Sequence, residues 1–280
     1  MHTYDLEPSF CFIAPISLLE FTKLSTSHLV LAHLVSESQE YAGFYKERSA
    51  QGDFVMMDNS AYELKEPYSP DKLLELAGRC GAHAIVLPDY PFQEAQVTID
   101  AANKFAPIFK AAGYKTFFVP QSKKGDKEDW ISSYEWASTN DAIDIIGMSI
   151  LGIPNAIPHI DPTFARVVMT EKLMQLGVFN HNKHHHYLGL NGGPRTEIPS
   201  LLRMNALDTI DSSGPIWSAV LGHEYTNNAD SLLMVKKPKM PVDFHIEVKD
   251  TVTHRRILHN IEMTKNLFLD TEDEVWYAQE

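Results

Sequence analysis

Short apolar runs alternate with longer segments of helical character through most of this chain. Apolar runs of about four to eight residues are typical of strands that are buried on both faces, as in parallel sheets. Neighbouring parallel strands need a crossover connection, which is usually a helix, so the alternation predicts an α/β fold. The sequence contains eight such runs, at Phe10–Ala14, Leu29–Val35, Phe54–Asp58, Ala84–Asp89, Thr116–Pro120, Ile143–Ile150, Tyr187–Leu190 and Leu207–Asp211.

The segments between these runs carry signals for the start and end of helices. Ser69 followed by Pro70 predicts an N-cap and a first turn, and the helix is expected to end at Gly78 or Gly81. Eight strands in alternation with helices predict a (β/α)8 barrel, a TIM-like fold, over residues 1–220. A doubly wound open sheet is the alternative. Further helices are expected at residues 94–112, 127–138, 162–176 and 194–204.

The chain after residue 220 differs in character from the predicted barrel. It contains a turn at residues 236–241, a strand-like run at Phe244–Val248 and a helical pattern from about Val252 to Leu269. We expect residues 221–280 to form a C-terminal extension that packs on the barrel, and not a separate domain.

Composition narrows the cellular setting. No window approaches 18 consecutive apolar residues, and the first residues lack a basic segment followed by an apolar run. Neither a transmembrane helix nor a signal peptide is therefore expected. Cys11 and Cys80 are too few for a disulfide framework or for a zinc site with three or four cysteine ligands. These features favour a cytoplasmic protein that does not contact membranes.

The charge balance is acidic. The chain has 24 Lys and Arg against 37 Asp and Glu, which gives a net charge of −13. This argues against a protein that binds polyanions in general, although it does not exclude nucleic acid as a substrate. Lys123, Lys124 and Arg195 lie shortly after predicted strands and are weak candidates for contacts with a backbone phosphate.

Polar residues gather where the predicted strands end, which is where barrels place their chemistry. A single Asp after a strand is often only a turn residue or a helix cap. Aspartates at three strand ends are harder to explain in that way. The candidates are Asp58, Asn59 and Tyr62 after the third strand, Asp89 and Tyr90 after the fourth, Gln121 after the fifth, Ser149 on the sixth, Gly189 and Leu190 on the seventh, and Asp211 on the eighth.

This set of residue types suits chemistry at a sugar carbon that carries a heterocyclic base. One carboxylate can attack the sugar carbon and hold a covalent intermediate, and a second can protonate the leaving group. A third can accept two N–H bonds from a base such as guanine, with an amide beside it. Glycine lets a planar ring approach the backbone closely, and Tyr62 or Tyr90 can stack on the ring. No Lys lies at a strand end, which disfavours a Schiff-base aldolase, and no phosphate-binding glycine motif is present.

The order of these motifs resembles the queuine and archaeosine tRNA-guanine transglycosylase superfamily, which is built on a (β/α)8 barrel. Met57-Asp58-Asn59-Ser60-Ala61-Tyr62 resembles the D-S-G-G-[FY] motif of that family. Val119-Pro120-Gln121 resembles its V-Q-G segment, and Thr209-Ile210-Asp211-Ser212-Ser213-Gly214-Pro215 resembles its F-D-C-x-x-P motif. Four further segments match in order, namely Phe12-Ile13-Ala14-Pro15, Val86-Leu87-Pro88-Asp89, Gly147-Met148-Ser149-Ile150 and His186-Tyr187-Leu188-Gly189-Leu190.

The resemblance spans roughly residues 10–215 and implies a role for each matching residue. Asp211 falls on the nucleophile and Asp58 on the general acid/base. Asp89 falls on the aspartate that reads the guanine edge, and Gln121 on the glutamine that binds the base. The resemblance implies no cofactor and no metal. It places Tyr62, Asn59, Ser149, Gly189 and Leu190 around the bound base.

Two departures bear on the substrate. No cysteine follows Cys80, so the C-x-C-x-x-C zinc site of the tRNA enzymes is absent, and the tRNA-docking extension is missing or reduced. A shorter, zinc-free chain is similar to the DpdA-like branch, the 7-deazaguanine DNA transglycosylases of bacteriophages and bacterial modification islands. The resemblance thus implies replacement of guanine in DNA by a preQ0-type base, in the host cytoplasm if the gene belongs to a phage. The partners would be DNA and a free 7-deazaguanine, with a homodimer as an option.

Three alternatives stay open from the sequence. The same exchange can act on tRNA, and a barrel nucleosidase or glycosidase can use the same carboxylates with water as acceptor. A catalytically silent barrel that binds a deazaguanine or a partner subunit is the third.

The histidine-rich run at residues 181–186 is interpreted as a surface loop before the seventh strand, with nucleic-acid or metal contact as less favoured readings. His33, on the predicted second strand, is interpreted as a hydrogen-bonded pocket or core histidine in preference to a base.

Overall fold

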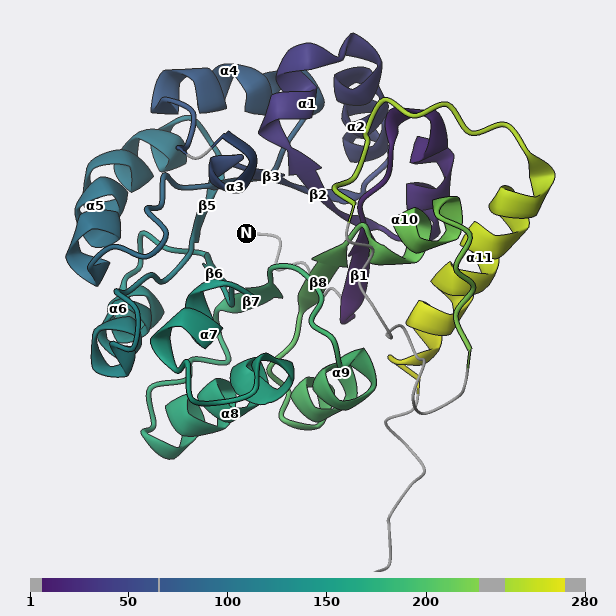
Figure 1. Ribbon diagram of the computed structural model, residues 1–280. Helices are drawn as coiled ribbons and strands as arrows, with labels where there is room; N and C mark the ends of the chain where they lie inside the picture. The colour runs from purple at the N-terminus through teal and green to yellow at the C-terminus, as the bar shows by residue number, and fades with distance from the viewer. Residues whose placement is uncertain (1–6, 65, 227–239, 270–280) are drawn as a thin grey trace, which may run out of the picture.

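The protein is a parallel barrel ringed by helices (Figure 1). The computed structural model describes residues 7–64, 66–226 and 240–269, without the side chains of Tyr62 and Glu63. In that part of the chain every strand pairs in parallel with its neighbours, in the order β1-β8-β7-β6-β5-β4-β3-β2. The strands are β1 (Ser9–Phe12), β2 (Ser27–Leu31), β3 (Phe54–Asp58), β4 (Ala84–Val86), β5 (Lys115–Phe118), β6 (Ile145–Gly147), β7 (His184–Tyr187) and β8 (Thr209–Ser212).

Helices connect successive strands and cover the outside of the barrel (Figure 1). The segments that follow β1, β2 and β3 are the 3-10 helix η1 (Ile16–Leu24), α1 (Ala32–Glu37), α2 (Gln39–Ala50), α3 (Ala61–Leu64) and α4 (Pro70–Cys80). Those that follow β4 to β8 are α5 (Ala95–Ala111), α6 (Lys127–Thr139), α7 (Gly152–Ala156), α8 (Pro162–Gln175), α9 (Pro194–Arg203), α10 (Gly214–Val220) and α11 (Thr251–Asn266).

Pairing of the last strand with the first makes the sheet a nearly closed barrel. β8 pairs with β1 in parallel from Thr209 opposite Ser9 to Ser212 opposite Phe12. β1 and β2 end the strand order, and Ser9 Oγ lies 3.0 Å from Ser27 Oγ across that seam. The predicted TIM-like (β/α)8 barrel is confirmed. The doubly wound open sheet is wrong, because β1 pairs with β8 and the other strands follow one another in chain order around the barrel.

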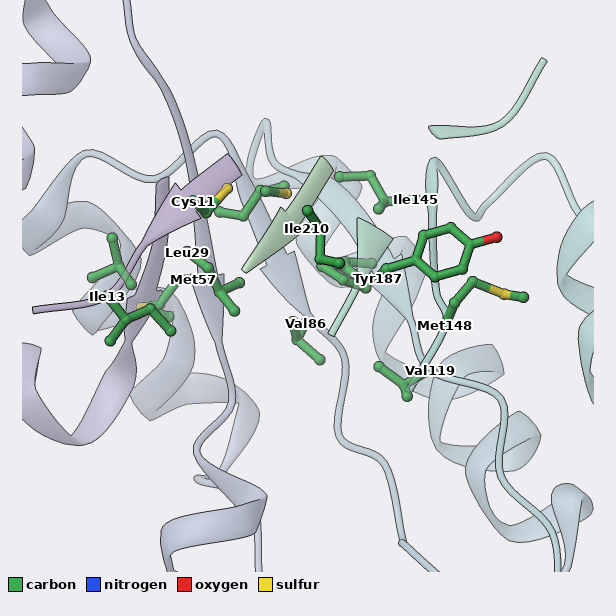
Figure 2. Packing of buried hydrophobic residues seen from close by; sticks show 14 of the residues in the cluster. Cys11, Ile13, Leu29, Met57, Val86, Val119, Ile145, Met148, Tyr187 and Ile210 are labelled. Carbon is green, nitrogen blue, oxygen red and sulfur yellow. The ribbon is translucent and has the colours of Figure 1, made fainter. Parts of the chain in front are cut away.

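Apolar side chains from the strands and the surrounding helices form one core (Figure 2). Cys11, Leu29, Met57, Val86 and Ile210 belong to it and come from five different strands. Because strand residues alternate between the two faces, one set fills the barrel and the other packs under the helices. This packing holds the carboxyl ends of the strands in fixed positions around one mouth.

Several local predictions agree with the structure, and the helix with the clearest capping signals is an example. Ser69 Oγ accepts a hydrogen bond from the Lys72 N–H at 3.4 Å, at the start of α4. The helix ends at Gly81, which adopts a left-handed φ of 68°. Four of the five other predicted helices match α5, α6, α8 and α9 to within one residue at each end. The fifth, predicted from about Val252 to Leu269, is α11, which ends at Asn266.

Five predicted strands need correction. The runs at Ala84–Asp89 and Ile143–Ile150 are the shorter strands β4 (Ala84–Val86) and β6 (Ile145–Gly147), each of which ends three residues before its prediction. The second strand ends at Leu31, and the apolar residues Ala32–Val35 open helix α1, because a short apolar run suits a buried helix as well as a strand. The strand-like run at Phe244–Val248 is a turn and an irregular segment. The seventh strand is His184–Tyr187, three residues earlier than its prediction at Tyr187–Leu190.

The C-terminal helix α11 packs against α10 on the outside of the barrel (Figure 1). Asn260 on α11 is buried and donates to the Pro215 and His223 carbonyls at 3.0 and 3.1 Å. Its Oδ1 accepts from the Tyr225 N–H at 2.8 Å. One asparagine thus fixes the connection between α10 and the chain that follows it. None of the helices in the described ranges is long and apolar enough to cross a membrane.

Gly147 on β6 tests how tightly the barrel is packed. A Cβ at this position would lie 2.8 Å from the Phe117 ring and 2.9 Å from Val119 Cγ2. We expect Gly147→Ala to lower the free energy of unfolding by about 1–3 kcal/mol, measured by chemical denaturation. The matched control is Gly43→Ala on α2, where a Cβ would meet nothing within 4 Å. That control should raise stability by about 1 kcal/mol, and equal effects of the two substitutions would contradict the packing argument.

Candidate functional site

Asp211 lies at the carboxyl end of β8 and is 5% exposed. Its Oδ1 accepts two hydrogen bonds, from the Gly189 N–H at 2.8 Å and from His186 Nε2 at 3.1 Å. Gly189 has a φ of 75°, and a Cβ there would lie 2.8 Å from Ile150 Cγ2. A glycine is therefore required to bring this backbone N–H to the carboxylate.

A buried ion pair holds the loop that carries Gly189. Arg166 on α8 and Glu197 on α9 are both fully buried and form a bidentate pair, with both N–O distances 2.7 Å. The guanidinium also donates to the carbonyls of Met148, Leu188 and Gly189 at 2.8–3.1 Å. All five of its N–H donors are thus used, which ties two helices to the ends of β6 and β7.

A second carboxylate cluster follows β4. Asp89 is buried, and its two oxygens accept hydrogen bonds from the side-chain amides of Asn59 and Gln121, each at 2.7 Å. Asn59 also donates to the Leu87 carbonyl at 2.8 Å. Burial raises the pKa of Asp89, and the two amide bonds partly offset this effect. The structure therefore brings together Asp89, Asn59 and Gln121, three of the residues predicted to bind a base.

Asp58 is the last residue of β3 and is half-buried. It lies opposite Leu31 in the register with β2, and its Oδ2 accepts a hydrogen bond from the Ser60 N–H at 3.2 Å. Ser60 has a φ of 58°, and its hydroxyl bonds to the His33 backbone N–H at 3.0 Å and to His33 Nδ1 at 3.1 Å. This tight turn fixes the direction in which the strand end leaves the barrel.

The other residues predicted to bind a base lie in different environments. Ser149 Oγ accepts from the N–H groups of Leu151 and Gly152 at 3.1 Å, so its hydroxyl is engaged in the turn that leads into α7. Leu190 is buried. Tyr62 is the second residue of the short helix α3, and its side chain lies outside the described part of the structure.

The candidate phosphate contacts lie at the surface. Lys123 is exposed and forms an ion pair with Glu94, which raises the pKa of the lysine. Lys124 is exposed, and so is Arg195 in the first turn of α9. These positions allow contact with a ligand, but the Glu94 partner lowers the attraction of Lys123 for a phosphate.

Only the first half of the histidine run at residues 181–186 is the surface loop that the sequence suggested, since residues 181–183 form a turn before β7 in which His181 and Asn182 are exposed. His184, His185 and His186 belong to β7, and His185 and His186 are fully buried. His186 packs on the Phe117 ring of β5 at 5.5 Å, and His184 on the Phe54 ring of β3 at 5.9 Å. Neither strand is a neighbour of β7, so these two histidines project into the barrel. His185 points outward and bonds to the Tyr134 hydroxyl of α6 at 2.7 Å.

Sequence reasoning missed Arg166, Glu197 and His186 as parts of the site. Arg166 and Glu197 lie on helices whose pattern gave no sign that these charges are buried. The spacing of His184 and His186 could have indicated that both face the barrel interior, because residues two apart in a strand lie on the same face. No group of three or more His, Cys, Asp or Glu in the described ranges is arranged to hold a metal ion.

A scan against models of known protein families finds no match to this chain, and a search of curated proteins finds none either. The chemistry of the site therefore follows from its own residues. Two buried carboxylates, each held by N–H donors, and a third half-buried carboxylate lie at the carboxyl ends of strands of one barrel.

The buried ion pair can be tested by removing one charge. We expect Glu197→Gln to lower the free energy of unfolding by about 3–5 kcal/mol, because the Arg166 charge is then buried without its counter-charge. Chemical denaturation measures this effect. Glu75→Gln, which breaks the exposed pair with Lys72, is the matched control and should leave stability unchanged. Equal stability of the two variants would show that the pair does not anchor the mouth.

His185 makes stability depend on pH. Burial lowers its pKa from 6.5 to about 3 in the folded state, so the unfolded chain binds a proton first as the pH falls. Stability from this residue is complete above pH 6.5 and is lost as the pH falls toward 3. Between pH 6.5 and 5 we expect wild type to lose about 2 kcal/mol more than His185→Phe, measured by denaturation at each pH. Parallel pH profiles would contradict the neutral buried state of His185.

Proposed function

We propose that this chain is a base-exchange transglycosylase that replaces guanine in DNA with a 7-deazaguanine of the preQ0 type. The observation that carries the proposal is that one barrel mouth holds two buried carboxylates, each with its own set of hydrogen-bond donors. Asp211 is held by two N–H donors on one oxygen. Asp89 is held by two side-chain amides that are themselves suited to hydrogen-bond a planar base. The motif order of the transglycosylase superfamily supports these assignments.

The first half of the proposed reaction removes guanine. Asp211 Oδ2 attacks C1′ of the target nucleotide, and the C1′–N9 bond breaks with its electron pair moving to N9. Asp58, in its protonated form, gives its proton to the leaving base and becomes a carboxylate. The products are free guanine and an ester between Asp211 and the sugar.

The second half re-forms a glycosidic bond. The incoming 7-deazaguanine loses its N9 proton to Asp58, and N9 attacks C1′ as the C1′–O bond of the ester breaks. Asp211 regains its negative charge, and Asp58 regains its proton. Two displacements at one carbon give net retention of configuration, as in two-step carboxylate chemistry on sugars generally.

A target guanine must leave the base stack before it can reach the carboxylates at the strand ends. Phe92 follows Asp89 by three residues, is 54% exposed and has a φ of 66°. A bulky residue in this conformation is strained, and strain of this kind concentrates at functional sites. An exposed aromatic ring three residues after Asp89 suits stacking on a neighbouring base of single-stranded nucleic acid.

A nucleosidase that transfers the sugar to water is the second candidate, with free nucleoside as substrate. Two observations favour it, the net charge of −13 and the ion pair of Lys123 with Glu94. Both weaken attraction to a polyanion. The experiment below also tests tRNA as the substrate of the same exchange.

The proposal is tested by mass spectrometry of nucleosides. DNA, tRNA and free deoxyguanosine are each incubated with purified protein and a panel of 7-deazaguanines. We expect a deazaguanine deoxynucleoside in the DNA digest, and at least about a 1,000-fold loss of product with Asp211→Asn because the amide is a poor nucleophile. Asp100→Asn on the exposed face of α5 is the matched control and should keep full activity.

Other outcomes identify the alternatives. Product in tRNA alone would assign the exchange to tRNA, and release of free guanine without incorporation would assign a nucleosidase. If no substrate gives product and a deazaguanine still binds tightly, the chain is a binding protein and not an enzyme.

A further inference from the structure

A chain of hydrogen bonds runs from Asp211 into the interior of the barrel. His186 Nε2 lies 3.1 Å from Asp211 Oδ1, and His186 Nδ1 lies 2.7 Å from Thr209 Oγ1. His184 Nε2 lies 2.7 Å from the same hydroxyl oxygen. The reaction proposed above uses neither histidine, although His186 is fully buried beside the carboxylate.

The direction of these hydrogen bonds follows from the ionised carboxylate. A carboxylate only accepts, so His186 must carry its proton on Nε2. In a neutral imidazole Nδ1 is then an acceptor, and the Thr209 hydroxyl donates to it. The oxygen of that hydroxyl in turn accepts from a proton on His184 Nε2. Burial lowers the pKa of His184 to about 3, which fits a neutral ring at pH 7.

Aromatic packing restrains both imidazoles. The Phe117 ring meets His186 at 5.5 Å with an interplanar angle of 68°, and the Phe54 ring meets His184 at 5.9 Å. Because these contacts reach across the barrel from β5 and β3, neither imidazole can turn without displacing a buried ring. The tautomer and the ring orientation of His186 are thus fixed from two sides.

Both donors to Asp211 act on the same oxygen. The Gly189 N–H and His186 Nε2 bond to Oδ1, while Oδ2 receives no hydrogen bond from the described part of the chain. We propose that His186 is a positioning residue, held in its Nε2–H form by Thr209 and His184, which anchors Oδ1 and so presents Oδ2 to the substrate. The role of Oδ2 rests on the function proposed above, whereas the tautomer of His186 does not.

The tautomer can be measured without any substrate. Long-range proton–nitrogen NMR on protein labelled with 15N-histidine distinguishes the two neutral forms and the cation at pH 7.5. His186→Gln assigns the signals. We expect His186 to carry its proton on Nε2, and Thr209→Val to shift its Nδ1 resonance because the donor is lost. Thr264→Val, which removes a buried hydroxyl from α11, is the matched control and should leave the His186 signals unchanged.

A His186 that is cationic, or protonated on Nδ1 alone, overturns the proposal. So does a Thr209→Val variant that is folded and leaves the Nδ1 resonance in place. These outcomes stand whatever the protein acts on, since they report only on the hydrogen-bond chain.

The positioning role is measured on the covalent intermediate. DNA and protein are mixed in a single turnover without added base, and the adduct on Asp211 is followed by mass spectrometry. We expect His186→Phe to slow adduct formation about 100-fold, because the carboxylate loses its fixed orientation. The affinity for free 7-deazaguanine, measured by calorimetry, should change little. His186→Gln keeps an N–H donor at a similar place and should recover a large part of the lost rate.

An unchanged adduct rate in His186→Phe, or an equal loss of rate and of base affinity, overturns the positioning role. Absence of an adduct in wild type with DNA and with tRNA overturns the proposed function instead. In that case the NMR measurement alone decides whether His186 holds Asp211 as inferred.

Discussion

The mouth of this barrel depends on one buried guanidinium. Arg166 donates all five of its N–H groups inside the protein, two to Glu197 and three to the carbonyls of Met148, Leu188 and Gly189. Those carbonyls belong to the ends of β6 and β7, where the chain turns outward. A buried charge of this kind is costly unless every donor is used, so the ion pair and the strand ends fix each other.

Arg166 is linked to the candidate nucleophile Asp211 through a single residue, Gly189. The Gly189 carbonyl accepts from Arg166, and the N–H of the same residue donates to Asp211. On its other side the carboxylate meets His186, which is held by Thr209 and His184. Asp211 therefore lies between two rigid supports, one reaching it from the helices outside the barrel and one from the barrel interior. Such support is what a site needs if a reacting atom is to be held in one place.

The sequence predicted the fold well because the fold depends on local patterns. The apolar runs and the caps, such as Ser69 and Gly81 around α4, are set by residues close together in the chain. It also predicted that Asp89, Asn59 and Gln121 would lie near one another, because strand ends converge at one mouth in a barrel. It failed where a pattern suits two structures. Ala32–Val35 is apolar enough for a strand or a buried helix, and His184–His186 is polar enough for a surface loop.

The sequence by itself determined the barrel, the helices around it and the strand ends at which carboxylates appear, because periodicity and capping act over a few residues. Only the tertiary structure decided which polar groups are buried and what they face. Arg166 and Glu197 lie 31 residues apart, and His186 and Asp211 lie 25 apart. Their pairing follows from barrel closure and strand register, which bring distant residues within hydrogen-bond distance. In the low-dielectric interior a charge without a partner would be prohibitive, so each buried partner is defined by its three-dimensional neighbours and not by its neighbours in sequence.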